Sequence, residues 1–261
     1  MKIPLYQVDA FTGHLFGGNP AAVCPLEEWL DDGLLQSIAA ENNLSETAYL
    51  VENGNGGYHL RWFTPSCEVD LCGHATLASA YVLMNHLVTD RTEIRFQTKS
   101  GELRVTRHDE LYTLDFPARP PAPCEKRPEG LVEALGRQPE EIWEAKAYMA
   151  VFESENDVRD LRPNFHLLGQ LDKYAVIVTA PGSTADFVSR FFAPKAGIPE
   201  DPVTGSAHCT LIPYWSDCLG KQSMLAHQVS ERGGEILCQD LGERVKISGR
   251  AVLYSTGMIH L

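Results

Sequence analysis

The stretch DLCGHATLASAYVLMNHL, residues 70 to 87, sets an acid, a thiol, a glycine and a histidine directly before an apolar run. Its length and composition predict a helix that begins near Gly73 and lies buried in the fold. Asp70, Cys72 and His74 crowded at a helix start first indicate a metal site or a nucleophile. The rest of the sequence bears on both interpretations.

The same pattern returns in the second half of the chain. RWFTP at 61–65 resembles RFFAP at 190–194, and a glycine follows each motif, Gly73 and then Gly205. Each glycine opens an apolar stretch that leads into a β-rich region. The offset is about 130 residues, half of the chain, which predicts an internal duplication. The CGH segment then has a partner in TGSAH at 204–208, and both loops are expected to line one cleft between two similar halves.

Length and composition set the scale of the fold. The chain has 261 residues, of which 44% are hydrophobic, enough for one large domain or two small ones. The proline-rich segment PARPPAPCEKRP at 117–128 is the best linker. We therefore expect an N-terminal half at 1–120 and a C-terminal half at 121–261, with terminal strands able to cross over.

Several classes of function are disfavoured by what the chain carries. The net charge is −13 and no Lys/Arg cluster is present, so no nucleic-acid partner is expected. No apolar run reaches the length of a membrane-spanning helix, so no membrane partner is expected either. Seven cysteines at irregular spacings favour reduced thiols in a cytoplasmic protein. No phosphate-binding or dinucleotide motif occurs, Gly17–Gly18–Asn19 is too short to count as one, and no cofactor is expected.

Local patterns place the main elements. Residues 3–11 read as a strand, residues 26–43 as a helix, and residues 47–63 as two strands around the turn ENGNGG. Residues 129–145, EGLVEALGRQPEEIWEA, read as a helix and are followed by a strand.

The two loops permit three kinds of chemistry. A helix start presents free backbone N–H groups that bind a carboxylate or stabilise an enolate-like charge. Close packing at glycine and capping by Asp70 or Thr204 would explain the same residues without a ligand. A metal at Cys67, Cys72 and His74 is disfavoured by their C-x4-C-x-H spacing, so no metal is expected. A two-thiol racemase would need a cysteine opposite Cys72, where Thr204 stands.

Two acids near these loops complete the candidates. Glu46 follows Ser45 in NNLSETAYL, between a polar helix end and a strand, where a capping or solvated role is the ordinary explanation. Asp201 stands before a proline in EDPVTGSAH, an ordinary turn position. If Glu46, His74 and Asp201 meet, they form a proton-handling set.

At these residues the sequence resembles the phenazine-biosynthesis PhzF-like proteins. The resemblance rests on four stretches in the same order and runs from residue 7 to about residue 250: DAFTGHLFGGNPAAV, IAAENNLSETAYLV, RWFTPSCEVDLCGHATLASA and GIPEDPVTGSAHCTLIPYW. It implies an α+β fold of the diaminopimelate-epimerase type. Two pseudo-symmetric halves would each curl a β-sheet around a central helix, with the active site in the cleft between them.

The resemblance also implies cofactor-free acid–base catalysis by an isomerase. In the best-known member a glutamate moves a proton within a cyclic hydroxy-amino acid, and that glutamate falls on Glu46. The supporting histidine and aspartate fall on His74 and Asp201. The loops that hold substrate are expected to contribute Ser45, Gly73, Gly205 and Ser206.

Some alternatives stay open. Related racemases use two cysteines, so Cys72 is either a second proton carrier or a packed thiol. An epimerase using Cys72, or a binding homologue without turnover, is the alternative to a proton-shifting isomerase. The expected partner is a small anionic carboxylic acid, an amino or hydroxy acid, and the family suggests a homodimer.

Overall fold

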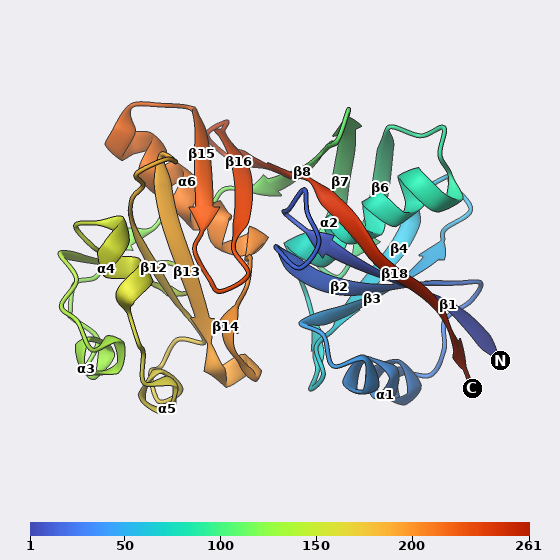
Figure 1. Cartoon of the computed structure of the whole chain (residues 1–261), viewed down its shortest axis with the longest axis horizontal. Helices are drawn as coiled ribbons and strands as arrows, with labels where there is room; N and C mark the ends of the chain where they lie inside the picture. The colour runs from blue at the N-terminus through green and yellow to red at the C-terminus, as the bar shows by residue number, and fades with distance from the viewer. The chain divides into compact units, whose positions relative to one another are not determined.

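The computed structural model describes all 261 residues and divides them into two compact units. Unit 1 holds residues 1–116 and 247–261, and unit 2 holds residues 117–246. The chain therefore passes from one unit to the other twice, and its C-terminal strand belongs with the N-terminal ones. In Figure 1 unit 1 runs from blue through cyan to the green of β7 and β8 and includes the red strand β18, and unit 2 runs from light green to orange-red.

Unit 1 consists of strands around one buried helix. Its elements are β1 Lys2–Ala10, β2 Asn19–Leu26, α1 Asp32–Asn42, β3 Glu46–Glu52, β4 Tyr58–Phe63, β5 Glu68–Val69, α2 Gly73–Val82, β6 Glu93–Thr98, β7 Gly101–His108, β8 Leu111–Pro117 and β18 Ala251–His260. A π-helical turn, Leu83–Leu87, extends α2. Nearly every residue of α2 is buried because strands β1, β2, β3, β7 and β18 contact it from several sides. That all-round burial explains why the helix is apolar on every face.

Unit 2 repeats this plan. Its elements are β9 Ala122–Pro123, α3 Leu131–Leu135, β10 Glu141–Glu144, β11 Tyr148–Val151, α4 Glu155–Asp160, α5 Phe165–Leu168, β12 Val176–Pro181, β13 Phe187–Ala193, β14 Ile198–Asp201, α6 Gly205–Leu219, β15 Ser223–Gln228 and β16 Gly234–Asp240. Strand β17, Arg244–Gly249, leads back to unit 1. The central helix is α6, which is buried over its first eleven residues except Ser206.

The strand pairings confirm the internal duplication. In unit 1, β2 and β3 are parallel, β3 and β4 antiparallel, β4 and β6 parallel, and β6 and β7 antiparallel. In unit 2 the same sequence of pairings joins β11, β12, β13, β15 and β16. The fold is thus the predicted α+β arrangement, two similar halves that each curl strands around a central helix.

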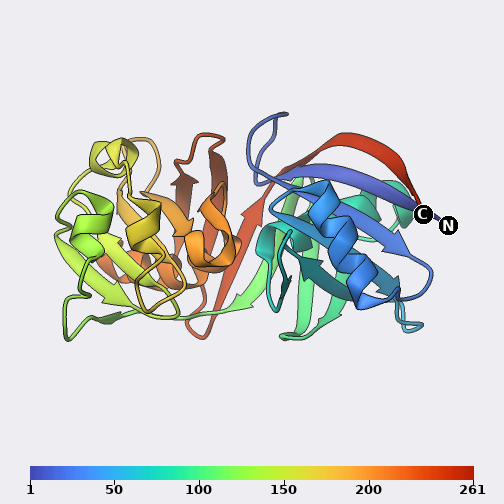
Figure 2. The same ribbon diagram turned by 90° about the horizontal axis from the view of Figure 1, so that it is seen from below.

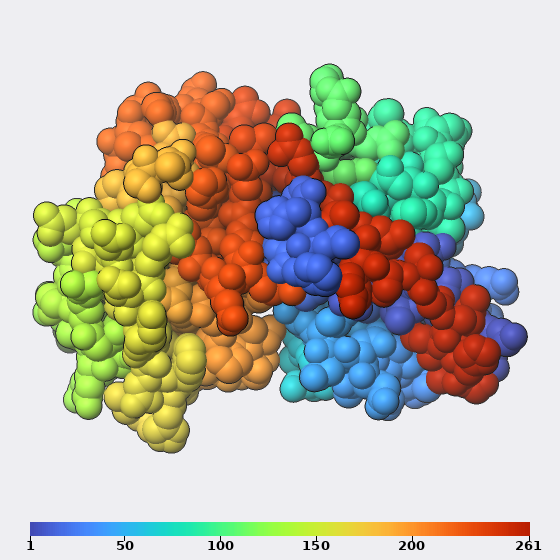
Figure 3. All heavy atoms as spheres, viewed as in Figure 1, coloured from blue at the N-terminus to red at the C-terminus, as the bar shows by residue number.

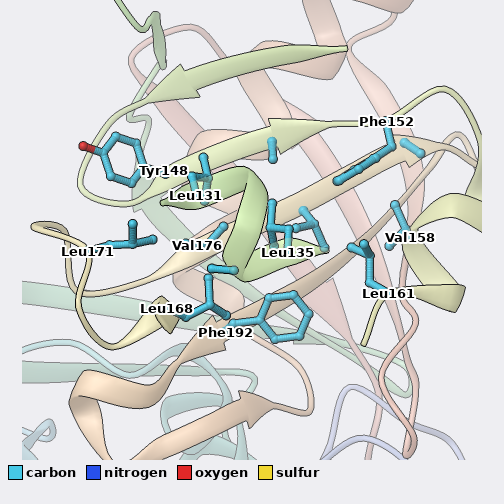
Figure 4. Close-up of a cluster of buried hydrophobic side chains, with 14 of the residues drawn as sticks. Leu131, Leu135, Tyr148, Phe152, Val158, Leu161, Leu168, Leu171, Val176 and Phe192 are labelled. Atoms are coloured by element: carbon cyan, nitrogen blue, oxygen red, sulfur yellow. The ribbon is translucent and has the colours of Figure 1, made fainter. Parts of the chain in front are cut away.

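The core of unit 2 lies between its strands and its three short helices. Figure 4 shows this cluster, in which Leu131 and Leu135 of α3 pack with Val158, Val176 and Phe192. These side chains are almost fully withdrawn from water, and burying each contributes roughly 1.5–3 kcal/mol. Unit 1 has a separate core beneath α1 that includes Leu35, Tyr49 and Phe63. Each unit therefore has its own apolar interior.

The helix predicted over residues 129–145 is wrong in its second half. Only Leu131–Leu135 are helical, because Gly136 takes a left-handed φ of 70° and ends the helix. Pro139 follows without an N–H, and Glu141–Glu144 then pair as β10 with β11. The ENGNGG hairpin is confirmed: β3 and β4 are antiparallel, and Gly54 and Gly56 have φ of 74°.

The two ends of the chain lie side by side on unit 1, as Figure 2 shows. Strand β1 pairs antiparallel with β18 along its whole length, from Lys2↔His260 to Ala10↔Ala251. Figure 3 shows β18, in red, on the surface beside the dark blue loop of residues 12–18. The rings of Phe16 in that loop and Tyr254 in β18 are in edge contact, with centroids 5.9 Å apart.

None of the helices combines the length and apolarity that crossing a membrane requires. All seven cysteines are free thiols, four of them buried.

Candidate active site

Three elements of unit 1 bring the first group of site residues together. Glu46 is the first residue of β3, which runs parallel to β2 with Ala21 opposite Glu46. Asn19 is the first residue of β2. Cys72 is the N-cap of α2, and His74 is its second residue. The starts of two parallel strands thus meet the start of the buried helix.

His74 lies at the centre of this group. Its Nε2 lies 3.1 Å from Oε2 of Glu46, at ion-pair distance, although ring and carboxylate are not aligned as a hydrogen bond. Its Nδ1 faces Nδ2 of Asn19 at 3.1 Å and Sγ of Cys72 at 3.5 Å. His74 is 3% exposed and Glu46 8%. Two predicted catalytic residues are therefore neighbours in a nearly dry site.

Asn19 bears on which ring nitrogen of His74 carries the proton that faces Glu46. In the neutral ring, the Asn19 amide N–H₂ donates to Nδ1, so the ring proton resides on Nε2. In the protonated ring, a turned amide would offer its oxygen to Nδ1–H. In both cases Nε2–H faces the Glu46 carboxylate. Asn19 is a residue of this group that the sequence reasoning missed, because it considered Gly17–Gly18–Asn19 only as a phosphate-binding motif.

The electrostatics of the group favour a charged pair. Burial alone lowers the pKa of His74, but the hydrogen bond with Cys72 and the charge of Glu46 outweigh it and hold that pKa above its ordinary value. Burial, with a smaller contribution from the Glu46 charge, raises the pKa of Cys72 to about 11. Cys72 is therefore a neutral thiol at neutral pH, and Glu46 is the charge that supports a protonated His74.

The same three residues offer donors of the kind that bind metals. One donor atom each from Glu46, Cys72 and His74 lies within 4.8 Å of the others. The thiol, however, faces Nδ1 of the ring, and the carboxylate faces Nε2. A chelated ion needs its ligands around one point, whereas these are arranged on the two sides of an imidazole. This geometry suits the movement of protons.

The second group of site residues lies in unit 2. Asp201 ends β14 and is 8% exposed, and Oδ2 accepts a 2.5 Å hydrogen bond from Oγ1 of Thr204. Thr204 is the N-cap of α6, but its hydroxyl serves Asp201 and leaves the helix uncapped. Gln228 of β15 accepts from the Thr204 N–H at 2.8 Å and donates to the Asp201 carbonyl at 2.7 Å. Thr204 and Gln228 thus orient Asp201, a role that the sequence reasoning did not assign.

The remaining predicted residues lie at the starts of these elements. Gly73 is the first residue of α2 and Gly205 the first of α6, and both are buried. Ser206 follows Gly205, and Ser45 precedes Glu46; both are partly buried. Neither Cys72 nor Thr204 caps its helix with its side chain, so backbone N–H groups at both helix starts are left for another acceptor.

Comparison with known proteins supports an isomerase class. An uncharacterized isomerase of Pseudomonas aeruginosa is 51% identical to the chain over the full length of both. A crystal structure of a phenazine biosynthesis PhzF-family protein from Enterococcus faecalis is 46% identical, covers all of both chains, and superposes with a TM-score of 0.96. A hydroxyproline epimerase of Agrobacterium vitis shares only the fold, at 11% identity and a TM-score of 0.63, covering 99% of this chain and 92% of its own.

The family model described as "Phenazine biosynthesis-like protein" matches residues 8–257, nearly the whole chain. Together with the full-length relatives, this match confirms the resemblance seen in the sequence motifs. The chain belongs to the phenazine biosynthesis-like (PhzF) family.

Proposed function

We propose that the protein is a cofactor-independent isomerase that moves a proton within a small carboxylic acid, an amino or hydroxy acid, with Glu46 as general base and acid. The observation that carries the proposal is the buried pair of Glu46 and His74 at the start of α2, with Oε2 and Nε2 3.1 Å apart. The isomerase class of the relatives supports the same reaction type.

In the proposed reaction a single residue, Glu46, both removes the proton and returns it. The Glu46 carboxylate takes a proton from a carbon next to an activating group, and the electron pair left behind delocalises into the substrate. Glu46 then returns the proton, either to a different carbon or to the same one, and is again a carboxylate. A charged His74 beside Oε2 holds the Glu46 side chain in place and leaves Oε1 for the substrate.

The helix starts are proposed to hold the substrate's own negative charge. At α2 the backbone N–H groups of the first turn receive no bond from the Cys72 side chain. The positive end of the helix dipole adds to their attraction for a carboxylate, as it does at α6. Ser45, Gly73, Gly205 and Ser206 belong to this part of the proposal.

We also propose that Asp201 takes part in the same reaction. Its carboxylate is oriented by Thr204 and Gln228 and lies in a buried setting, as a group that relays a proton requires. Asp201→Asn should lower turnover while unit 2 stays folded. Normal turnover in that variant would remove Asp201 from the mechanism.

An epimerase that uses Cys72 is the second candidate. The observation in its favour is the 3.5 Å separation of the Cys72 thiol from His74, which could accept its proton. Against it stand the raised pKa of Cys72 and the threonine at the matching position of unit 2. Cys72→Ser should then leave proton exchange intact, whereas loss of stereoisomer interconversion in this variant would favour the epimerase.

The deciding experiment is hydrogen exchange in D₂O with a panel of amino and hydroxy acids, cyclic ones included, followed by mass spectrometry and NMR. The native protein should introduce deuterium into one substrate class. Glu46→Gln should fold normally and exchange about 100- to 10,000-fold more slowly. Glu52→Gln, at the exposed other end of β3, is the matched control.

The position of the deuterium separates the two reactions. Label at a new carbon supports a proton shift, and label at the same stereocentre supports epimerisation. Full exchange in Glu46→Gln would exclude Glu46 as the base. Tight stoichiometric binding without any exchange would favour a binding homologue. A homodimer and a cytoplasmic location stay predictions.

A further inference from the structure

Unit 2 contains a cavity of about 220 Å³ that takes no part in the site described above. It lies where the second half of α6 meets β10 and the proline-rich segment before β9. Its lining residues are Pro120, Pro121, Glu141, Trp143, Pro213, Tyr214, Asp217 and Cys218. Since a water molecule occupies about 30 Å³ of liquid, the cavity has room for a ligand the size of about seven waters.

A proline inside helix α6 helps to build this cavity. Pro213 has no N–H, so the carbonyl of Cys209, one turn earlier, loses its helical partner. The backbone N–H of Arg119 takes that place and donates to the Cys209 carbonyl at 2.8 Å. This bond ties the segment that follows, Pro120 and Pro121, to the helix as one wall of the cavity.

Two aromatic rings form another wall. The centroids of Trp143 and Tyr214 lie 5.3 Å apart with an interplanar angle of 69°. Both rings turn their polar edges to one carboxylate oxygen: Oε2 of Glu141 accepts from Trp143 Nε1 at 2.6 Å and from the Tyr214 hydroxyl at 3.2 Å. Tyr214 is 8% exposed and its ring also contacts Trp215, at a centroid distance of 5.3 Å, so Trp143 is the ring whose π surface can meet a ligand.

The charged side chains that line the cavity are all acidic. Glu141 and Asp217 are acids, and no lysine, arginine or histidine lines the cavity. Neither carboxylate forms an ion pair in the structure. An anion would be repelled here, and a metal ion would find only two carboxylates among prolines and rings. A cation with an apolar coat would gain from both the carboxylates and the π surface of Trp143.

We propose that this cavity binds a small organic cation, a tertiary or quaternary ammonium. Such a cation sheds water more readily than a lysine ammonium and fits an aromatic wall through cation–π attraction. Glu141, fixed by its two aromatic donors, supplies the counter-charge, and Asp217 adds to it. This site is independent of the proposed isomerase chemistry.

The test compares two probes of one shape on the native full-length protein. Choline is the cation, and 3,3-dimethylbutan-1-ol is its neutral carbon isostere. Binding is followed by the indole N–H signal of Trp143 in a ¹⁵N-correlated NMR spectrum, assigned by its loss in Trp143→Phe. Choline should shift this signal saturably, and the neutral isostere should bind about tenfold more weakly. Equal binding of the two probes, or no saturable shift with choline, would overturn the proposal.

Removing the carboxylate charges of the cavity and measuring choline binding provides a second, independent test. Glu141→Gln with Asp217→Asn should weaken choline binding about tenfold, because Gln keeps an acceptor for Trp143 Nε1 and Tyr214 but loses the charge. Glu140→Gln removes the same charge one residue away, outside the cavity, and should leave binding unchanged. Unweakened binding in the double variant would also overturn the proposal.

Discussion

At the scale of single residues, the site depends on which groups contact the two ring nitrogens of one histidine. His74 has an amide and a thiol at Nδ1 and a carboxylate at Nε2. The sequence motifs identify His74 and Glu46, but they do not show that Asn19, 55 residues away, supplies the amide. A contact of that separation follows from the packing of α2 against β2, which no local pattern reveals.

Asn19 can be tested apart from catalysis. Asn19→Ala removes the amide that pairs with Nδ1 of His74 and should cost about 1–3 kcal/mol of unfolding free energy, because a buried ring nitrogen loses this partner. At a pH above the pKa of His74, the ¹⁵N shifts of its ring should show less of the neutral Nε2–H form than in the native protein. Unchanged shifts would mean that Cys72 or another group sets the tautomer. Asn19→Asp, which can only accept when ionised, should favour the doubly protonated ring.

The buried His208 should make the folded protein less stable in acid. It is fully buried in α6, Nδ1 donates to the Thr204 carbonyl at 2.9 Å, and Nε2 has no partner. Burial lowers the pKa of His208 to about 4, against about 6.5 in an unfolded chain. The unfolded state therefore binds the proton first. Stability is fully present above pH 6.5, falls as the pH drops from 6.5 towards 4, and loses about 3 kcal/mol in total.

Urea unfolding between pH 7 and 4 checks this expectation. His208→Asn keeps a donor towards the Thr204 carbonyl and removes the titrating group, so its pH dependence should be flatter. His166→Asn, at an exposed histidine of α5, is the control and should follow the native curve. A native-like slope in His208→Asn would show that other groups cause the acid loss.

At the scale of elements, the duplication preserves an arginine clamp. In unit 1, Arg61 of β4 pairs with Glu68 through Nε and a terminal nitrogen at 2.7 and 2.9 Å. In unit 2, Arg190 of β13 pairs with Glu200 at 2.7 and 2.8 Å. Each guanidinium also lies over a phenylalanine two residues on, Phe63 or Phe192, at 5.1 and 4.9 Å. The clamp fixes the segment that leads into each helix start.

The arginine of the unit 2 clamp should matter more to stability because it is the more buried of the two. The Arg190 side chain is 10% exposed, whereas that of Arg61 is 20% exposed. Arg190→Met should destabilise the protein by about 1–3 kcal/mol, since the carbonyls of Val158 and Leu161 lose the donor Nη1, and Arg61→Met by less. Urea denaturation measures both. Arg190→Met with Glu200→Leu should recover part of the loss; no recovery would mean that the hydrogen bonds from Arg190 Nη1 to the carbonyls of Val158 and Leu161, at 3.1 and 3.0 Å, dominate.

The elements also show where sequence patterns are enough to predict the structure. The repeated arginine and glycine motifs predicted the duplicated architecture, and ENGNGG predicted its hairpin, because both signals are local and chemically specific. The helix predicted over residues 129–145 was wrong in its second half because the charges and leucines of this segment suit a helix. The left-handed Gly136 and the pairing of Trp143 with Met149 decide against it. Tertiary pairing overrode propensity there.

At the scale of the whole molecule, unit 2 is an insertion in unit 1. Residues 117–246 form a continuous unit with its own core, whereas residues 1–116 need β18 as the partner of β1. A fragment of residues 117–246 should therefore unfold cooperatively on its own. A fragment of residues 1–116 should not, unless a chain covering 247–261 is supplied.

Circular dichroism with urea unfolding of the separate fragments provides the measurement. Cooperative unfolding of the 1–116 fragment alone would show that β1 needs no partner at its β18 edge. A 117–246 fragment without a cooperative transition would show that unit 2 depends on unit 1.

The return of β18 to β1 also fixes the order of events on the ribosome. The first 116 residues emerge early, but the strand that completes their sheet is synthesised only after all of unit 2. Unit 2, which begins later, has all of its residues available sooner. The nascent chain therefore carries an incomplete N-terminal sheet with an open edge for most of its synthesis, and this is the interval in which a chaperone would have most to protect.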